Sequence, residues 1–127
     1  MVLVFGGAYN GKLDFVKDKF NINDKDIFHI NDELEIDFSK KVIRNFQKLT
    51  YNMSLHNNDV KEYLEKNIRL LEDKIIISDD ISEGIVPLKK EDRIWREANG
   101  KALQYLALNS KSIYRVFCGI PMVMKDE

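Results

Sequence analysis

A glycine-rich turn that ends in a lysine follows a short apolar stretch at the start of this chain. Four residues separate Gly6 from Gly11-Lys12, which is the G-x-x-x-x-G-K spacing of a phosphate-binding P-loop. Such a loop needs a strand before it and a helix after it, because its N–H groups and the helix N-terminus together surround a phosphate. The motif therefore predicts an α/β fold with a nucleotide site after its first strand. The predicted nucleotide-binding residues are Gly6, Gly7, Ala8, Tyr9, Asn10, Gly11, Lys12 and Leu13.

The residue after the lysine departs from this motif. P-loops carry Ser or Thr there, and its hydroxyl binds Mg²⁺, but this chain has Leu13. We expect GTP or ATP as the nucleotide of this loop. Because Leu13 has no hydroxyl, we regard a bound Mg²⁺ as doubtful and predict no metal-ligating residues. An alternative interpretation is that Gly6 and Gly7 only form a tight turn, with Lys12 on the surface.

Length and charge exclude several classes of protein. The 127 residues suffice for one domain, and 20 basic against 21 acidic residues give a net charge of −1. No overall field therefore attracts nucleic acid or an anionic membrane. A single cysteine, Cys118, fits a reducing compartment, and no apolar run approaches the ~20 residues of a membrane helix. No basic region precedes the first apolar run, so we expect no signal peptide and a cytoplasmic protein.

Apolar patterning predicts an alternation of strands and helices. Short β-branched or aromatic runs predict strands over residues 2–5, 26–30, 74–78 and 113–118. Helical spacing predicts helices over residues 12–20, 38–53, 59–71 and 88–108, and residues 119–124 fit an edge strand. We expect a P-loop NTPase-like fold: an open, mostly parallel sheet of about four to five strands with helices on both faces. Ligands of such sheets bind where the strands end.

Two blocks of the sequence resemble one family. The first is Gly-Gly-Ala-x-x-Gly-Lys at residues 6–12. The second comprises Ile-Ile-Ile-Ser-Asp-Asp at 75–80, Gly-Ile-Val-Pro at 84–87, and a following segment with Arg93, Arg96-Glu97, Gly100 and Gln104. The chain is similar to the adenosylcobinamide kinase/adenosylcobinamide-phosphate guanylyltransferase family of cobalamin biosynthesis. The middle of the chain matches poorly, so we expect residues 1–127 to form a single shortened P-loop kinase-like domain.

The resemblance implies a transferase that acts on two ligands. Enzymes of this family phosphorylate the aminopropanol hydroxyl of adenosylcobinamide with a nucleoside triphosphate, and then transfer GMP to that phosphate through a guanylylated histidine. It thus implies a nucleotide and adenosylcobinamide as partners, and a homo-oligomer. The residues carried over as catalytic are Lys12, Asp80, Arg93 and Arg96. The two arginines, three apart on one helix face, either clamp a phosphate or pair with nearby carboxylates.

Several departures from the family concern its chemistry. Leu103 stands where the family has an asparagine. The family also has a central strand that ends in an acidic residue. The nearest stretch here is residues 46–50, in which the amide Gln47 is the nearest equivalent of that acid. No histidine-bearing helix is recognisable, since we expect His29 within a strand, buried or half-buried, and His56 in a polar turn.

Other polar residues have ordinary structural interpretations. We expect Asp79 and Glu83 to lie in a solvated loop, although a carboxylate there could replace a lost metal ligand. We expect Cys118 to be a packed small hydrophobic residue and Trp95 to belong to the core or an interface.

Three functions remain open. The first is a compact kinase or nucleotidyltransferase with weakened catalysis and no guanylyl step. The second is a non-catalytic protein that binds a nucleotide or a corrinoid. The third is a vestigial subunit that keeps the family's oligomerising surfaces.

Overall fold

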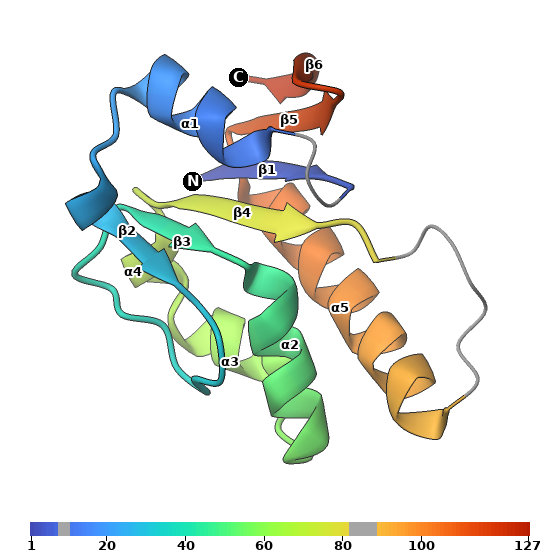
Figure 1. The fold of residues 1–127 in the computed structure, drawn as a ribbon. Coiled ribbons are helices and arrows are strands. Elements are labelled where there is room, and N and C mark those ends of the chain that lie inside the picture. Colours follow the sequence, from blue (N-terminus) through green and yellow to red (C-terminus); the bar gives the residue numbers. More distant parts are fainter. Residues whose placement is uncertain (8–10, 82–88) are drawn as a thin grey trace.

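A mostly parallel sheet forms the centre of the computed structural model, which describes residues 1–7, 11–81 and 89–127 (Figure 1). Its strands are β1 (Val2–Gly6), β2 (Ile27–His29), β3 (Val42–Arg44), β4 (Ile75–Asp79), β5 (Ser112–Phe117) and β6 (Ile120–Asp126). The helices are α1 (Lys12–Phe20), α2 (Phe46–Leu55), α3 (Val60–Lys66), α4 (Ile68–Leu71) and α5 (Lys90–Asn109), with a 3₁₀ turn at Asp24–Asp26. None of these described helices combines the length and the apolar character that a membrane crossing needs.

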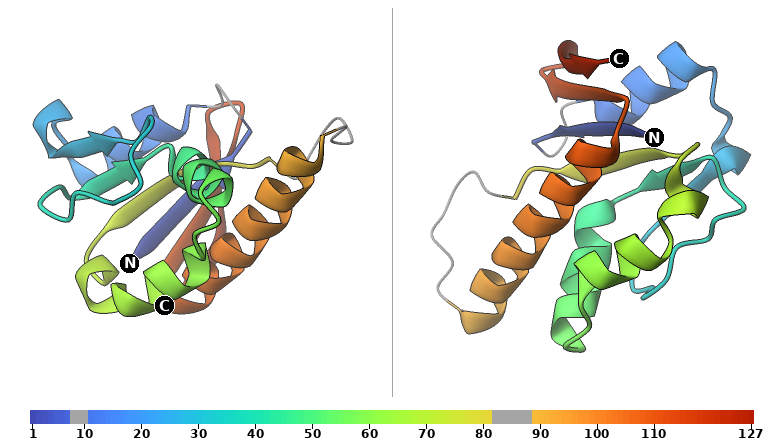
Figure 2. Two further views of the ribbon diagram at one scale, coloured as in Figure 1. Left: turned by 90° about the horizontal axis from the view of Figure 1, so that it is seen from below. Right: turned by 180° about the vertical axis from the view of Figure 1, so that it is seen from behind.

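The strand order β2-β3-β4-β1-β5-β6 confirms the predicted fold class. Neighbouring strands from β2 to β5 pair in parallel, and β6 joins β5 in the antiparallel direction. The sheet has six strands, slightly more than the four to five expected. Helix α1 covers one face, and α2, α3 and α5 cover the other, as Figure 2 shows. The carboxyl ends of β1, β3 and β4 therefore share one edge, where α1 and α2 begin.

One predicted helix is wrong in its first half. Residues 42–44 form strand β3 instead of continuing a helix over 38–53. Val42 and Ile43 are fully buried between β2 and β4, which suits consecutive β-branched residues in a parallel sheet. Asn45 then adopts a left-handed conformation (φ 63°) and α2 begins at Phe46. A strand this short carries no periodicity of its own, so its residues also fit the helical spacing of α2.

The other expected helices and the edge strand need smaller corrections. The helix expected over 59–71 is divided into α3 and α4 at Asn67. The tail forms the edge strand β6, as predicted. Cys118, however, is exposed, because it and Gly119 (φ 50° and 76°) make the two-residue turn of the β5–β6 hairpin. His29 lies in β2 as expected, but it is exposed rather than buried or half-buried.

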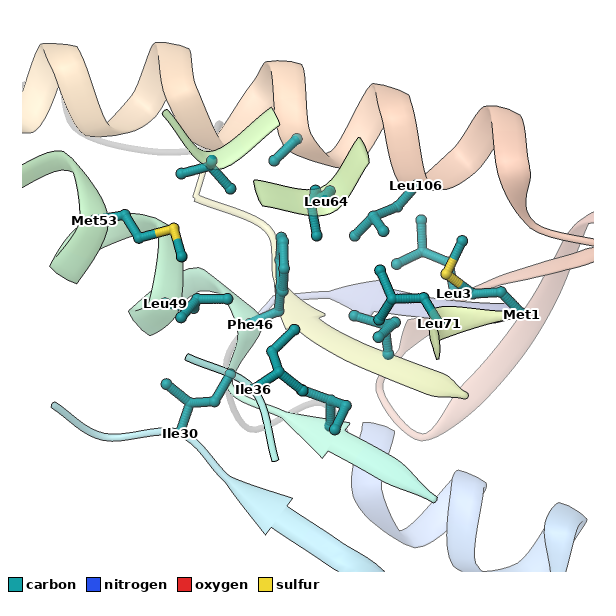
Figure 3. Packing of buried hydrophobic residues seen from close by; sticks show 14 of the residues in the cluster. Met1, Leu3, Ile30, Ile36, Phe46, Leu49, Met53, Leu64, Leu71 and Leu106 are labelled. Atoms are coloured by element: carbon teal, nitrogen blue, oxygen red, sulfur yellow. The ribbon is translucent and has the colours of Figure 1, made fainter. Parts of the chain in front are cut away.

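Two apolar layers hold the helices to the sheet. The larger layer lies between the sheet and α2, α3 and α5, and Figure 3 shows its labelled members, among them Phe46, Leu64 and Leu106. The smaller layer packs α1 against the opposite face through Val16 and Tyr114. Phe15 adds a ring contact to Tyr114, with the centroids 5.2 Å apart. These layers fix the starts of α1 and α2 relative to the sheet edge.

Two glycines should respond oppositely to alanine. A Cβ atom at Gly6 would lie 2.3 Å from the backbone oxygen of Val116, whereas one at Gly100, within α5, would meet nothing within 4 Å. We expect Gly6→Ala to lower the free energy of unfolding by about 1–3 kcal/mol through overpacking. Gly100→Ala should raise it by about 1 kcal/mol through helix propensity. Urea unfolding followed by circular dichroism measures both, and a Gly6→Ala protein as stable as the parent would contradict this packing.

Candidate nucleotide-binding site

A pocket of about 650 Å³ opens where β1, β3 and β4 end and where α1 and α2 begin. This volume lies within the range of small-molecule sites. Three segments line it: the start of α1, the junction of β3 with α2, and the end of β4. The lining residues are Gly11, Lys12, Leu13, Asp14, Arg44, Asn45, Gln47, Lys48, Ile77 and Asp79.

The predicted P-loop has the structural context that its motif requires. Gly6 ends β1, and Gly11, with φ 81°, precedes the first residue of α1. Ala8, Tyr9 and Asn10 lie outside the described residues, as does the block at residues 84–87. Leu13 lines the pocket, and it also packs against the apolar layer under α1. The strand–loop–helix arrangement is therefore present around the part of the loop that the structure describes.

Lys12 is buried within this site, so the surface position considered for it is wrong. Only 6% of the residue is exposed. Its Nζ atom donates to the backbone oxygen of Gly7 at 2.6 Å and forms an ion pair with Oδ1 of Asp79 at 2.8 Å. The ammonium group therefore lies between Gly7, just after β1, and the end of β4.

Asp79 differs from the solvated loop residue that was expected. It is the last residue of β4, and 30% of its side chain is exposed. While Oδ1 pairs with Lys12, Oδ2 accepts a hydrogen bond of 3.3 Å from Nε2 of Gln47. The N–H of Asp79 donates to Oε1 of Gln47 at 3.0 Å. Both carboxylate oxygens thus have partners inside the protein.

A buried polar network fixes Gln47. Its backbone oxygen lies 3.0 Å from Nε1 of Trp95 and 2.9 Å from Oγ1 of Thr50. Thr50, which is fully buried, also contacts Nε1 of Trp95 at 3.0 Å and Oδ1 of Asn99 at 2.8 Å. Tyr51 meets the Trp95 ring edge-on at 5.1 Å. Trp95 is therefore an interface residue between α2 and α5, and the network keeps Gln47 in reach of Asp79.

Among the cavities that the structure describes, none is lined by all four residues carried over as catalytic. Lys12 lies in the 650 Å³ pocket, whereas Asp80 and Arg96 line a separate, mostly apolar cavity of about 390 Å³ between α5 and the sheet. The N–H of Asp80 donates to the Gly6 oxygen at 2.7 Å, and Nε of Arg96 donates to the Ile81 oxygen at 3.4 Å. Arg93 is exposed on α5 and is not among the described residues that line either cavity.

Sequence reasoning missed several residues that line the pocket, among them Arg44, Asn45 and Lys48. Arg44 ends β3, the strand that the sequence did not reveal, and Asn45 and Lys48 come after it. The available signal was the pair Val42-Ile43 with Asn45 two residues after it, because asparagine readily takes the left-handed conformation that ends a strand. Nη1 of Arg44 lies 3.2 Å from Nδ1 of His29. Desolvation of the imidazole, followed by the charge of Arg44, lowers the pKa of His29 below its usual value.

The P-loop position that usually supplies a hydroxyl ligand to Mg²⁺ carries no such group in this chain. Magnesium requires oxygen ligands in near-octahedral geometry. Leu13 offers none, and the carboxylate of Asp79 is shared between Lys12 and Gln47. Within the ranges 1–7, 11–81 and 89–127, no group of three or more His, Cys, Asp or Glu side chains is placed to hold a metal.

Comparison with known proteins identifies the family. A sequence model described as cobinamide kinase / cobinamide phosphate guanyltransferase matches residues 31–124, which is more than half of the chain. The chain belongs to this family. The matched region includes the β3–α2 junction and β4, which form two of the three segments that line the pocket, and it begins after the P-loop. No curated protein matches the chain.

Proposed function

We propose that this family member binds GTP or ATP in the pocket between α1 and α2 and slowly phosphorylates adenosylcobinamide, without a guanylyl step. The observation that carries the proposal is the position of Lys12, which places a buried ammonium at the end of β1 beside a cavity of ligand size. Membership in the cobinamide kinase / cobinamide phosphate guanyltransferase family supplies the substrate class.

The expected slowness follows from the charges that the reaction needs. In such a transfer the cobinamide hydroxyl oxygen attacks the γ-phosphorus, the bond to the bridging oxygen breaks, the nucleoside diphosphate leaves, and the hydroxyl proton is released. Catalysis depends on cations that neutralise the phosphate oxygens. Lys12 is one such cation, but it is shared with Asp79. Loss of a single electrostatic element typically lowers kcat by about 10²–10³.

Neither histidine is among the described residues that line the pocket, which favours the absence of the guanylyl step. The sequence has two, His29 and His56. His29 lies on a strand with Nδ1 against Arg44. His56 follows the last residue of α2, and its Nδ1 contacts the backbone oxygen of Asn52. Because α2 begins at the pocket and has ten residues, His56 lies about 15 Å from that end of the helix.

A non-catalytic protein that binds a nucleotide or a corrinoid, or a vestigial subunit, is the alternative. The ion pair between Lys12 and Asp79 favours it, because it neutralises the very group that a P-loop offers to phosphate. The two functions differ in turnover and share the nucleotide pocket, so binding and transfer need separate measurements.

Lys12→Ala tests the nucleotide site. We expect the parent protein to bind GTP or ATP in calorimetric titrations, and the variant to lose that binding because the ammonium inside the pocket is gone. Lys66→Ala, which removes an exposed lysine paired with Glu62 on α3, is the matched control and should bind as the parent does. Transfer of labelled γ-phosphate to adenosylcobinamide then separates the slow enzyme from the non-catalytic alternative. Binding that survives in Lys12→Ala would contradict the assigned site.

We also propose that the chain forms a homo-oligomer through its β5–β6 hairpin. The hairpin exposes large apolar side chains, which on protein surfaces often mark contacts with partners. They are Phe117 at 59%, Ile120 at 64%, Met122 at 43%, Val123 at 61% and Met124 at 59% exposure.

Met122→Asp tests this surface. We expect the parent to sediment as an oligomer and Met122→Asp to sediment as a monomer, because a carboxylate cannot be buried unpaired in an apolar contact. Leu108→Asp changes an exposed leucine near the end of α5 and should leave the oligomer intact. A monomeric parent protein, measured by analytical ultracentrifugation, would refute the proposal.

A further inference from the structure

Two cationic side chains, Arg44 and Lys48, line the pocket, and Leu13 stands where a P-loop usually has the hydroxyl that binds Mg²⁺. We infer that the pocket binds the phosphates of its ligand without a metal ion, and that Arg44 and Lys48 meet the outer phosphates in its place. The inference deepens the proposed function and rests on it, since it names how the same pocket neutralises a polyphosphate.

Arg44 is suited to phosphate by position and by chemistry. It is the last residue of β3, it is half-buried, and it lines the same pocket as Lys12. Its contact with Nδ1 of His29 involves one guanidinium nitrogen, Nη1. A guanidinium has five N–H donors in a planar fork, which matches two oxygens of one phosphate.

Lys48 adds a second positive charge from the first turn of α2. It is exposed and lines the same pocket. Within the described part of the chain, no carboxylate forms an ion pair with Lys48 or with Arg44. Both cations therefore line the pocket without an ion pair to any carboxylate of the described residues, in contrast to Lys12.

The start of α2 strengthens this positive region. Asn45, the residue before α2, directs its side chain to the oxygen of Ile30 and makes no capping hydrogen bond to the helix. The N–H of Lys48 donates to the backbone oxygen of Asn45, and the N–H groups of Phe46 and Gln47 before it have no side-chain cap. Such N–H groups favour an anion, and they add to the two side-chain charges.

The charges along the lining predict how Mg²⁺ affects binding. Lys12 and Asp79 neutralise each other, which leaves Arg44 and Lys48 against the exposed Asp14. A Mg²⁺ ion bound to the nucleotide would place another cation against this net positive wall and would occupy phosphate oxygens that the side chains need. The free nucleotide should therefore bind at least as tightly as its magnesium complex.

The test is a set of calorimetric titrations of the full chain with GTP and with inorganic tripolyphosphate, each in EDTA and in excess Mg²⁺. We expect both ligands to bind in EDTA at least as tightly as in Mg²⁺. Arg44→Ala and Lys48→Ala should each weaken binding in EDTA about tenfold, the order expected for a charged hydrogen bond. Arg44→Lys should fall between the parent and Arg44→Ala, because it keeps the charge and loses the fork. Lys61→Ala, which removes an exposed lysine on α3, should bind as the parent does.

Two different failures are distinguishable. Binding of GTP that requires Mg²⁺, or parental affinity in both Arg44→Ala and Lys48→Ala, would overturn the metal-free site and leave the proposed nucleotide pocket standing. Absence of GTP and ATP binding in every condition would overturn both. Since Lys48 is exposed, Lys48→Ala keeps the test decisive if Arg44→Ala disturbs β3, which thermal unfolding of each variant would reveal.

Discussion

The parallel pairing of β1 with β4 is the constraint on which the site depends. Their register sets Gly6 beside Asp79, so the P-loop and the end of β4 meet at one edge of the sheet. The ion pair between Lys12 and Asp79 is a direct consequence of this register. Because side chains alternate along a strand, a slip of one residue would turn Asp79 away from Lys12 and bring its neighbour there instead. The chemistry of the pocket is therefore set by strand pairing before any ligand binds.

Sequence reasoning reached the fold class, the strand–loop–helix context of the P-loop and the edge strand, since each has a strong local signal. It could not find β3, whose three buried residues are too few to show a period. That omission hid Arg44 and Lys48. Sequence reasoning also ended the strand that corresponds to β4 at residue 78, whereas β4 ends at Asp79. Asp79 thus passed for a loop residue, although its partner is distant in sequence and only tertiary structure brings the two together.

Two features of the pocket concern how it neutralises phosphate: the loss of a magnesium-binding hydroxyl and the contacts that hold Lys12. The usual magnesium-binding hydroxyl is replaced by Leu13, which lines the pocket and packs against the layer under α1. The buried network through Thr50, Trp95 and Asn99 holds Gln47 in hydrogen-bond contact with Asp79. Asp79 in turn holds Lys12 through their ion pair. We interpret the site as one in which Lys12 stays paired with Asp79 and the side chains of Arg44 and Lys48 bind the phosphates. In this interpretation, phosphoryl transfer is slow.

The most direct test of this account is the affinity of Asp79→Asn for GTP, measured by calorimetry in EDTA beside the parent protein. The substitution removes the negative charge that holds Lys12 and changes the size of the side chain very little. If Lys12 must leave Asp79 to reach a phosphate, the variant binds GTP more tightly than the parent, because no carboxylate competes for the ammonium. If the variant binds more weakly, Asp79 assists the ligand, and the claim that it restrains Lys12 is wrong.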